Sequence, residues 1–339
     1  MLRYGGPFLF LIALPILYSW HPLDVLLIIP VIVGALLVRG GEVASRPEVA
    51  TAPGDHRAIP RVFVFGVLAL LLWGLHRSIV PSLPIGDFLA LAIALGVICG
   101  IFGLVAAHEM IHSRSRVDQF CGQSLLALLS YRHFHIAHLY GHHRFAATPL
   151  DPSTARRGES SYRFVVRTIL QQWIFAWRFE RRRLAGKAWH WPANRCCQDL
   201  ATMVALYLSL FVLLGWRAVL LMALVSAIAI FLLEMFNYVA HYGMERRRDG
   251  VRGREPLGPA HSWNTSGIVA NSLLFNMGRH SDHHRRAQTP YHRLQAEPGG
   301  PVLPGGYAGG ILMALIPPLW WRYMDPRLAA HDELLTAVS

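Results

Sequence analysis

The sequence predicts an all-α membrane protein of about six transmembrane helices in three hairpins, with a histidine-rich region at one end of the bundle. Two observations lead to this prediction. Hydrophobic residues make up 53% of the 339 residues and charged residues only 15%, which is too apolar for an ordinary soluble domain. Nine histidines also fall in four short clusters, each beside a membrane-length apolar run or in the polar tail.

The apolar runs set the helix count, because a bilayer core of about 30 Å takes roughly 20 helical residues. The hairpin turns are indicated by His21-Pro22, by the Pro81–Gly86 segment and by Gly215-Trp216. The predicted spans are 8–20, 23–38, 62–80, 88–107, 202–214 and 218–238. Two shorter apolar pieces, 124–130 and 311–321, are expected to be interfacial or re-entrant. We expect a single membrane-embedded domain over residues 1–339.

The basic residues orient the predicted bundle. The formal net charge of +12 is compatible with nucleic acid or with an anionic membrane surface. With six spans, however, the loops on one side carry only Arg77 and Arg217. The other side is therefore predicted to be cytoplasmic, with segments 108–199 and 239–339 on it. Topology accounts for the basic excess, and we expect no nucleic-acid partner.

The histidine clusters predict a metal centre. They comprise His108 and His112; His138, His142 and His143; His241; and His280, His283 and His284. A lone histidine pair is more often structural than metal-binding, but four clusters on one side of one membrane are improbable by chance. Nine imidazoles exceed the needs of one ion and fit two ions with four to six ligands each. This number favours two ions of redox-active iron, and two zinc ions remain an alternative.

The spacing also predicts how the ligands are presented and supported. His108 and His112 share a helix face, as do His138 and His142, because they lie four residues apart. Asn237 and Glu234 precede His241 on its face of the last span. Together with Glu109 and Asp282, they are candidates for contacts that hold the ligands in place.

Two other functional classes fit parts of this pattern. His108-Glu109-x-x-His112 matches the zinc-metalloprotease pattern, which would leave seven clustered histidines unexplained, so a membrane protease is a remote alternative. A non-enzymatic metal-binding or transport protein is a further alternative. A transporter should place ionisable groups at mid-membrane, yet the predicted spans are nearly uncharged apart from Glu234.

The motifs resemble those of a known family. Asn237-Tyr-Val-Ala-His241-Tyr-Gly, Arg279-His-Ser-Asp-His-His284 and the run 141–160 resemble the integral-membrane alkane monooxygenases, within the membrane fatty acid desaturase and hydroxylase superfamily. The resemblance covers about residues 60–295. It implies two non-haem iron ions that use O₂ and external electrons to hydroxylate an inert C–H bond, first of all the terminal carbon of an alkane. A lipid desaturase and a xylene-type aromatic side-chain monooxygenase remain alternatives.

The resemblance also implies partners and a location. These are a rubredoxin or ferredoxin with its NAD(P)H-dependent reductase, O₂, an apolar substrate entering from the bilayer, and a bacterial inner membrane with the active site on its cytoplasmic side. The four cysteines show no CxxC spacing, so no redox module is predicted within the chain. Arginines at 156–157, 181–183 and 246–248 would attract an acidic carrier, although retention of basic loops explains the same charges.

The sequence departs from the family pattern at a few positions. Ala137 and Ala240 stand where the alkane hydroxylases usually have glutamate, and Ser113 follows the first cluster in place of lysine. Thr289–Leu294 is a loose version of the family's tail motif. All nine histidines are present, so we expect metal binding to be retained. The departures bear instead on groups around the ligands and on the substrate.

Overall fold

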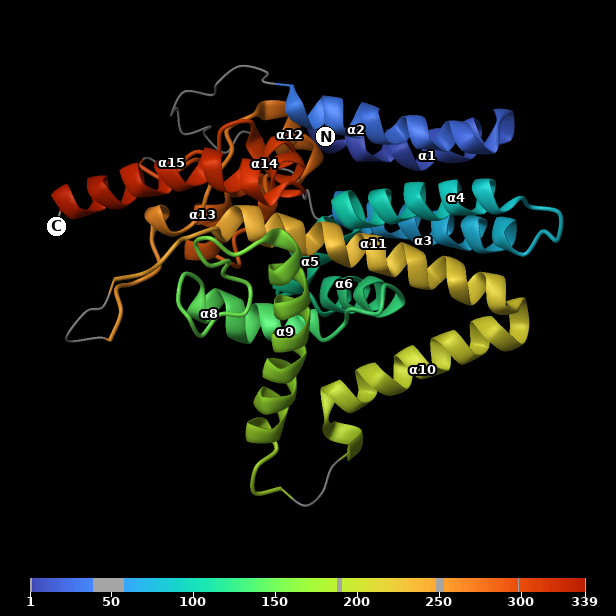
Figure 1. The fold of residues 1–339 in the computed structure, drawn as a ribbon. Coiled ribbons are helices and arrows are strands. Elements are labelled where there is room, and N and C mark those ends of the chain that lie inside the picture. The colour runs from blue at the N-terminus through green and yellow to red at the C-terminus, as the bar shows by residue number, and fades with distance from the viewer. Residues whose placement is uncertain (1, 39–57, 188–190, 248–252, 298, 339) are drawn as a thin grey trace.

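The computed structural model describes residues 2–38, 58–187, 191–247, 253–297 and 299–338. Within these ranges the regular elements are helices, joined by one isolated β-bridge between Asn264 and Val302. The prediction of an all-α protein is confirmed. The apolar helices run roughly alongside one another in a bundle, and most of the short helices of the polar region gather at one end of it (Figure 1).

Four continuous helices are long and apolar enough to cross a membrane. They are α3 (Ala58–Ser78), the joined helix of α4 (Ile85–Ile98), the π-helix η3 (Cys99–Gly103) and α5 (Leu104–His112), α10 (Arg195–Leu214), and α11 (Trp216–His241). They overlap four of the six predicted spans and extend beyond them at one or both ends. Ile85–His112 runs on past the predicted end at residue 107, so that the first histidine cluster forms the last turn of a spanning helix.

The first two predicted spans coincide with shorter apolar helices. Helix α1 covers Gly6–Trp20, and a second helix runs from Pro22 to Leu37 as η2 (Pro22–Leu27) and α2 (Ile28–Leu37). These two segments contact each other, α1 packs on α3, and η2 packs on α4, so this hairpin belongs to the bundle (Figure 1). The prediction of six spans stays open at these two short helices.

Helix packing at one glycine positions the first histidine cluster. Helix α6 (Arg116–Leu128) begins where the Ser115 hydroxyl accepts a hydrogen bond from the Asp118 N–H, and it packs along α5. A Cβ atom on Gly122 would lie 2.8 Å from the Ala107 carbonyl oxygen and 3.0 Å from the Met110 Cβ. The absence of a side chain at Gly122 therefore lets α6 approach the turn that carries His108. The short apolar piece predicted at 124–130 is the end of this helix.

The remaining elements are mostly short helices, and most of them lie at one end of the bundle (Figure 1). They are α7 (Phe134–Ala137), the π-helix η4 (His138–His142), α8 (His143–Phe145), α12 (Ile268–Leu273), α13 (His280–Arg285), α14 (Gly306–Ala314) and α15 (Pro317–Val338), with 3₁₀ turns η1 (Leu2–Tyr4), η5 (Trp191–Ala193), η6 (Pro259–His261) and η7 (Tyr291–Arg293). The second short apolar piece, 311–321, is divided between α14 and α15. Because these two helices meet near residue 316, the apolar run turns there instead of continuing.

A long helix that the hydrophobicity pattern did not predict, α9 (Ser161–Arg183), projects from the histidine region toward the start of α10 (Figure 1). The fully buried Glu180 carboxylate closes the corner between them, with Arg183 Nη2 at 2.7 Å and Arg195 Nη2 at 2.6 Å. Burial alone would raise the pKa of this carboxyl, but the two arginines outweigh it and lower the pKa to about 2. Helix α9 is thus tied at its far end to a membrane helix.

We expect Gly122→Ala to destabilise the protein and to displace His108 and His112, because the added methyl group meets backbone rather than a flexible side chain. Overpacking of this kind costs about 1–3 kcal/mol. The melting temperature in detergent and the metal content per chain should both fall. Gly86→Ala is the matched control, since a Cβ there meets nothing within 4 Å. Equal effects from the two variants would contradict the role given to Gly122.

Candidate metal centre

All nine histidines singled out in the sequence gather at the polar end of the bundle, in two adjacent groups. The first group, of five, is His108, His112, His138, His143 and His283, and the second, of four, is His142, His241, His280 and His284. Within each group the ligand atoms lie within 4.8 Å of one another. Among the described residues, no cysteine or carboxylate joins either group.

Helix geometry decides which group each histidine enters. His108 and His112 of α5 lie four residues apart and share the first group, as their spacing predicts. His138 and His142 do not share a group. Since η4 is a π-helix, in which hydrogen bonds close five residues apart instead of four, it is His143 that returns to the side of His138.

The two His-His dipeptides therefore serve both groups. His142 belongs to the second group and His143 to the first, while His283 belongs to the first and His284 to the second. The remaining members come from the end of α11, which carries His241, and from the start of α13, which carries His280. Four segments distant in sequence are brought together at this one place.

More ring nitrogens converge than hydrogen bonding can satisfy. His138 Nε2 lies 2.7 Å from His108 Nε2, 3.0 Å from His112 Nε2 and 3.0 Å from His143 Nε2. In the second group, His280 Nε2 lies 2.9 Å from His241 Nε2 and 3.1 Å from His284 Nε2. A neutral imidazole carries a single N–H, so His138 cannot hydrogen-bond three acceptors at once. A cation placed among these lone pairs would satisfy them together.

Burial keeps these imidazoles in the form that binds metals. It lowers the pKa of His138, His143, His280 and His284 well below the usual value, and neighbouring histidines lower each further. Burial likewise lowers the pKa of His283 to about 3. Metal ligation requires neutral imidazole. At neutral pH these ligands therefore need lose no proton before an ion binds.

One carboxylate contacts a ring of the centre directly. Asp151 Oδ2 lies 2.8 Å from His142 Nδ1 and accepts a hydrogen bond from the Thr154 hydroxyl at 2.7 Å, while Asp151 Oδ1 accepts one from the Ser153 N–H at 3.0 Å. Burial alone would raise the pKa of Asp151, but His142 and Thr154 outweigh it and hold that pKa below its usual range. The carboxylate fixes the proton of His142 on Nδ1 and frees Nε2 for a metal.

Sequence reasoning missed this role of Asp151. The residue falls within the run 141–160 that carries the family resemblance, nine residues after His142. Nothing in the spacing showed that the loop would fold back. The signal that could have pointed to Asp151 was its position in this run, which resembles the family motif.

The four residues predicted to support the ligands bond to the surrounding scaffold. Glu109 accepts a hydrogen bond from the Tyr291 N–H at 3.0 Å, and Asp282 holds Arg286 Nε at 2.7 Å. Glu234 accepts a hydrogen bond from Asn237 Nδ2 at 3.0 Å. Any support that these residues give to the centre acts through the segments that carry the histidines.

The two alanines that replace the family's glutamates are buried beside the centre. Ala137 ends α7 immediately before His138, and the Ala240 carbonyl accepts a hydrogen bond from the Trp263 N–H at 2.8 Å. The backbone at both positions is part of the scaffold. A carboxylate at either position would introduce a negative charge into a buried site next to a ligand.

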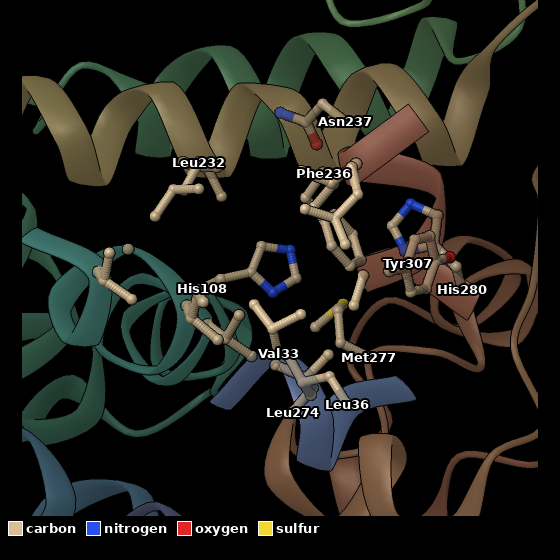
Figure 2. A pocket seen from close by; sticks show the side chains of 18 of the residues that line it. Val33, Leu36, His108, Leu232, Phe236, Asn237, Leu274, Met277, His280 and Tyr307 are labelled. Carbon is tan, nitrogen blue, oxygen red and sulfur yellow. The ribbon is translucent and has the colours of Figure 1, made fainter. Parts of the chain in front are cut away.

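An apolar cavity of about 220 Å³ opens onto the centre. Its walls come from α2, the joined helix α4–α5, α11 and α14, and its polar end is formed by His108, His138 and His280 (Figure 2). Apart from these histidines, Asn237 and Tyr307, the side chains that line it are apolar. Leu312 lines the cavity and is also 44% exposed, so this wall reaches the outer surface of the helices.

Comparison with known proteins places this centre in a family. The fatty acid desaturase family model matches residues 86–297. Alkane 1-monooxygenase 2 of Pseudomonas aeruginosa is 35% identical, over 90% of this chain and 81% of its own length. The chain belongs to the alkane 1-monooxygenase family. An alkane 1-monooxygenase of Ectopseudomonas oleovorans is 37% identical, over 78% of this chain and 65% of its own length.

A more distant relative links the alkane 1-monooxygenase family to aromatic substrates. The xylene/toluene monooxygenase hydroxylase component of Pseudomonas putida is 29% identical, over 80% of this chain and 72% of its own length. The family predicted from the histidine clusters and their flanking motifs is confirmed, and so is its place in the desaturase superfamily. The chain is therefore a membrane oxidoreductase with histidine clusters suited to metal binding.

We expect Asp151→Asn to weaken metal binding in the four-histidine group about 10- to 100-fold, because the amide no longer holds a proton on His142 Nδ1 as a carboxylate does. Metal analysis after dialysis against a weak chelator should show loss from one of the two groups before the other. Asp332→Asn, on the exposed face of α15, is the control. Retention of metal equal to that of the control would rule out this role for Asp151.

The metal-free protein should lose stability as the pH falls below about 6.5. The unfolded chain then binds protons that the buried imidazoles do not, so the free energy of unfolding decreases until the folded-state pKa is reached, which for His283 is about 3. Each such histidine contributes about 1.4 kcal/mol per pH unit. In melting curves recorded with a chelator, the melting temperature of His283→Leu should depend less on pH than that of the wild type. His76→Gln, which changes an exposed histidine, is the control and should show the pH dependence of the wild type. The same pH dependence in all three proteins would contradict the prediction.

Proposed function

We propose that the protein is an alkane 1-monooxygenase that inserts one oxygen atom of O₂ into the terminal C–H bond of an alkane. The balance is RH + O₂ + 2e⁻ + 2H⁺ → ROH + H₂O. The observation that carries the proposal is the apolar cavity that ends at two groups of converging histidines. The relatives named alkane 1-monooxygenase support the reaction and the substrate.

Two iron ions are the proposed cofactors, held by the groups of five and four histidines. Bound iron would take up the two electrons and activate O₂, chemistry that redox-inert zinc does not supply. The chain's own contribution is position and environment. The buried imidazoles fix the ions, Asp151 orients His142, and the apolar cavity walls exclude water from the reacting end.

The cavity suits an unbranched apolar chain. Away from its histidine end, Asn237 and Tyr307, its lining is apolar and offers no partner to a charged or strongly polar substrate. Because the exposed Leu312 forms part of its wall, an alkane dissolved in the bilayer would enter from the side. The alkane would then lie with its terminal carbon toward His108, His138 and His280.

The electrons are proposed to come from a rubredoxin or ferredoxin with its NAD(P)H-dependent reductase. Arg285 and Arg286, which follow the ligands His283 and His284 directly, are 48% and 41% exposed at their side chains. Both are ion-paired with Asp282 or Glu297, so the positive charge for an acidic carrier comes mainly from other exposed arginines. Arg156, Arg157 and residues 181–183 are exposed as well.

The arginines at 246–248, which were also predicted to attract an acidic carrier, differ from these. Arg246 donates to the carbonyl oxygens of Glu255 and Arg144, so its side chain also holds the fold. Arg248 lies outside the described residues. We propose that this face is cytoplasmic, that the membrane is the bacterial inner membrane, and that the whole chain acts as one membrane-embedded domain.

A xylene-type reaction is the second candidate, favoured by the relative that is 29% identical. It differs in the substrate, whose methyl group would be hydroxylated at the same centre. A desaturase reaction would share metals and cavity but yield an alkene. The protease alternative assigns Glu109 as a general base, whereas the Glu109 carboxylate accepts a hydrogen bond from a backbone N–H.

Metal and product analysis of the purified protein tests the proposal. We expect about two irons per chain, following from two histidine groups, and a terminal alcohol from octane or longer alkanes when rubredoxin, its reductase and NAD(P)H are supplied. No product should form without the carrier. Zinc alone with no oxidation of any apolar substrate would refute it. Oxidation of p-xylene but no alkane would assign the second candidate, and an alkene product would assign a desaturase.

A further inference from the structure

An amide side chain interrupts the apolar wall of the cavity close to the centre. Asn237 lies on α11 one helical turn before the ligand His241, and its side chain lines the cavity. Its Nδ2 donates to Glu234 Oε2 at 3.0 Å. Figure 2 shows the amide oxygen of Asn237 directed toward the other lining side chains, with the nitrogen turned away. A hydrogen-bond acceptor therefore faces the space proposed for the substrate.

The buried Glu234 carboxylate dictates this orientation of the amide. Besides Asn237, it accepts hydrogen bonds from the Tyr131 hydroxyl at 2.7 Å and from Gln172 Nε2 at 3.1 Å. A carboxylate surrounded by donors accepts from each of them. A flipped Asn237 amide would place its oxygen against a carboxylate oxygen. The network therefore holds Nδ2 toward Glu234 and Oδ1 toward the cavity.

The other polar groups of the described lining are donors or are directed to other partners, apart from the second lone pair of the Tyr307 hydroxyl. The Tyr307 hydroxyl donates to the Trp263 carbonyl oxygen, and the Nε2 atoms of His108, His138 and His280 face their histidine groups. The Nδ1 atoms of His108 and His280 have no hydrogen-bond partner among the described residues, but with Nε2 turned to the histidine groups they carry the ring proton and act as donors. Asn237 Oδ1 is thus an acceptor that this wall offers to a ligand. An alkane cannot donate to it, and an acceptor left unpaired beside an apolar ligand is unfavourable.

We propose that Asn237 Oδ1 is a binding subsite for the hydroxyl group of a primary alcohol. The inference rests on the proposed hydroxylation, which would create such a hydroxyl on the terminal carbon, at the end of the cavity where Asn237 lies. The alcohol O–H donates to Oδ1, while the alkyl chain keeps the contacts of the alkane. The protein therefore holds the alcohol more tightly than an alkane of similar size.

A ligand comparison isolates this hydrogen bond. 1-Octanol and nonane have the same number of heavy atoms and differ in the hydroxyl group. Their dissociation constants are measured on the iron-loaded protein without an electron carrier, by displacement of a radiolabelled alkane, so that no turnover occurs. Partition into detergent is the same for every variant and cancels when the octanol-to-nonane ratio of dissociation constants is compared between proteins.

We expect Asn237→Leu to weaken the binding of octanol roughly three- to tenfold relative to that of nonane. This is the usual range for loss of one neutral hydrogen bond. Met277→Leu is the matched control, since Met277 lines the same cavity without such an acceptor; its ratio should equal that of the wild type. An unchanged ratio in an iron-loaded Asn237→Leu variant would overturn the proposal.

A measurement on the wild type alone covers the case in which the variant fails to fold. Methyl heptyl ether matches octanol in size and can accept but not donate a hydrogen bond. Octanol should bind more tightly than the ether after each value is corrected for its partition into protein-free detergent, and equal affinities would overturn the subsite. Failure of the proposed function is a separate result, namely no alcohol from any alkane under full turnover conditions.

Discussion

The structure of the polar end depends on nitrogen lone pairs that point at one another. Nε2 atoms from distant segments approach to between 2.7 and 3.1 Å in surroundings where burial keeps the rings uncharged. Such an arrangement loses hydration and leaves few donors among many acceptors. Bound cations would reverse the balance, so metal binding and the folding of this region are linked. The apolar bundle fixes the ends of α5 and α11, and the loops bring η4 and α13 to them.

The sequence predicted the helical class, four of the long helices and all nine converging histidines, because these features depend on composition and local spacing. Three features could not be predicted in this way. The division of the ligands depends on π-helical geometry at His138–His142, which the residue pattern does not reveal. Helix α9 is polar along one side, so it contains no long apolar run from which it could be predicted. The contact of Asp151 with His142 depends on how a loop folds back.

The two histidine groups are unequal in charge as well as in number. One has five ligands, and the other has four, of which His142 shares its Nδ1 proton with a carboxylate. Asp151 therefore passes part of its negative charge through the imidazole to one side of the centre. Glutamates at positions 137 and 240 would have added charge near both groups. Among the described residues, the asymmetry depends on the Asp151 carboxylate, which contacts a ligand ring directly.

The placement of the His-His dipeptides joins the two groups mechanically. Neighbouring residues on a peptide backbone cannot move independently, and each dipeptide has one ring in either group. Any rotation of η4 or α13 that improves the geometry around one ion must also displace a ligand of the other. The centre is thus expected to behave as one cooperative unit in metal loading, in which the first ion organises the ligands for the second and partly filled protein is scarce.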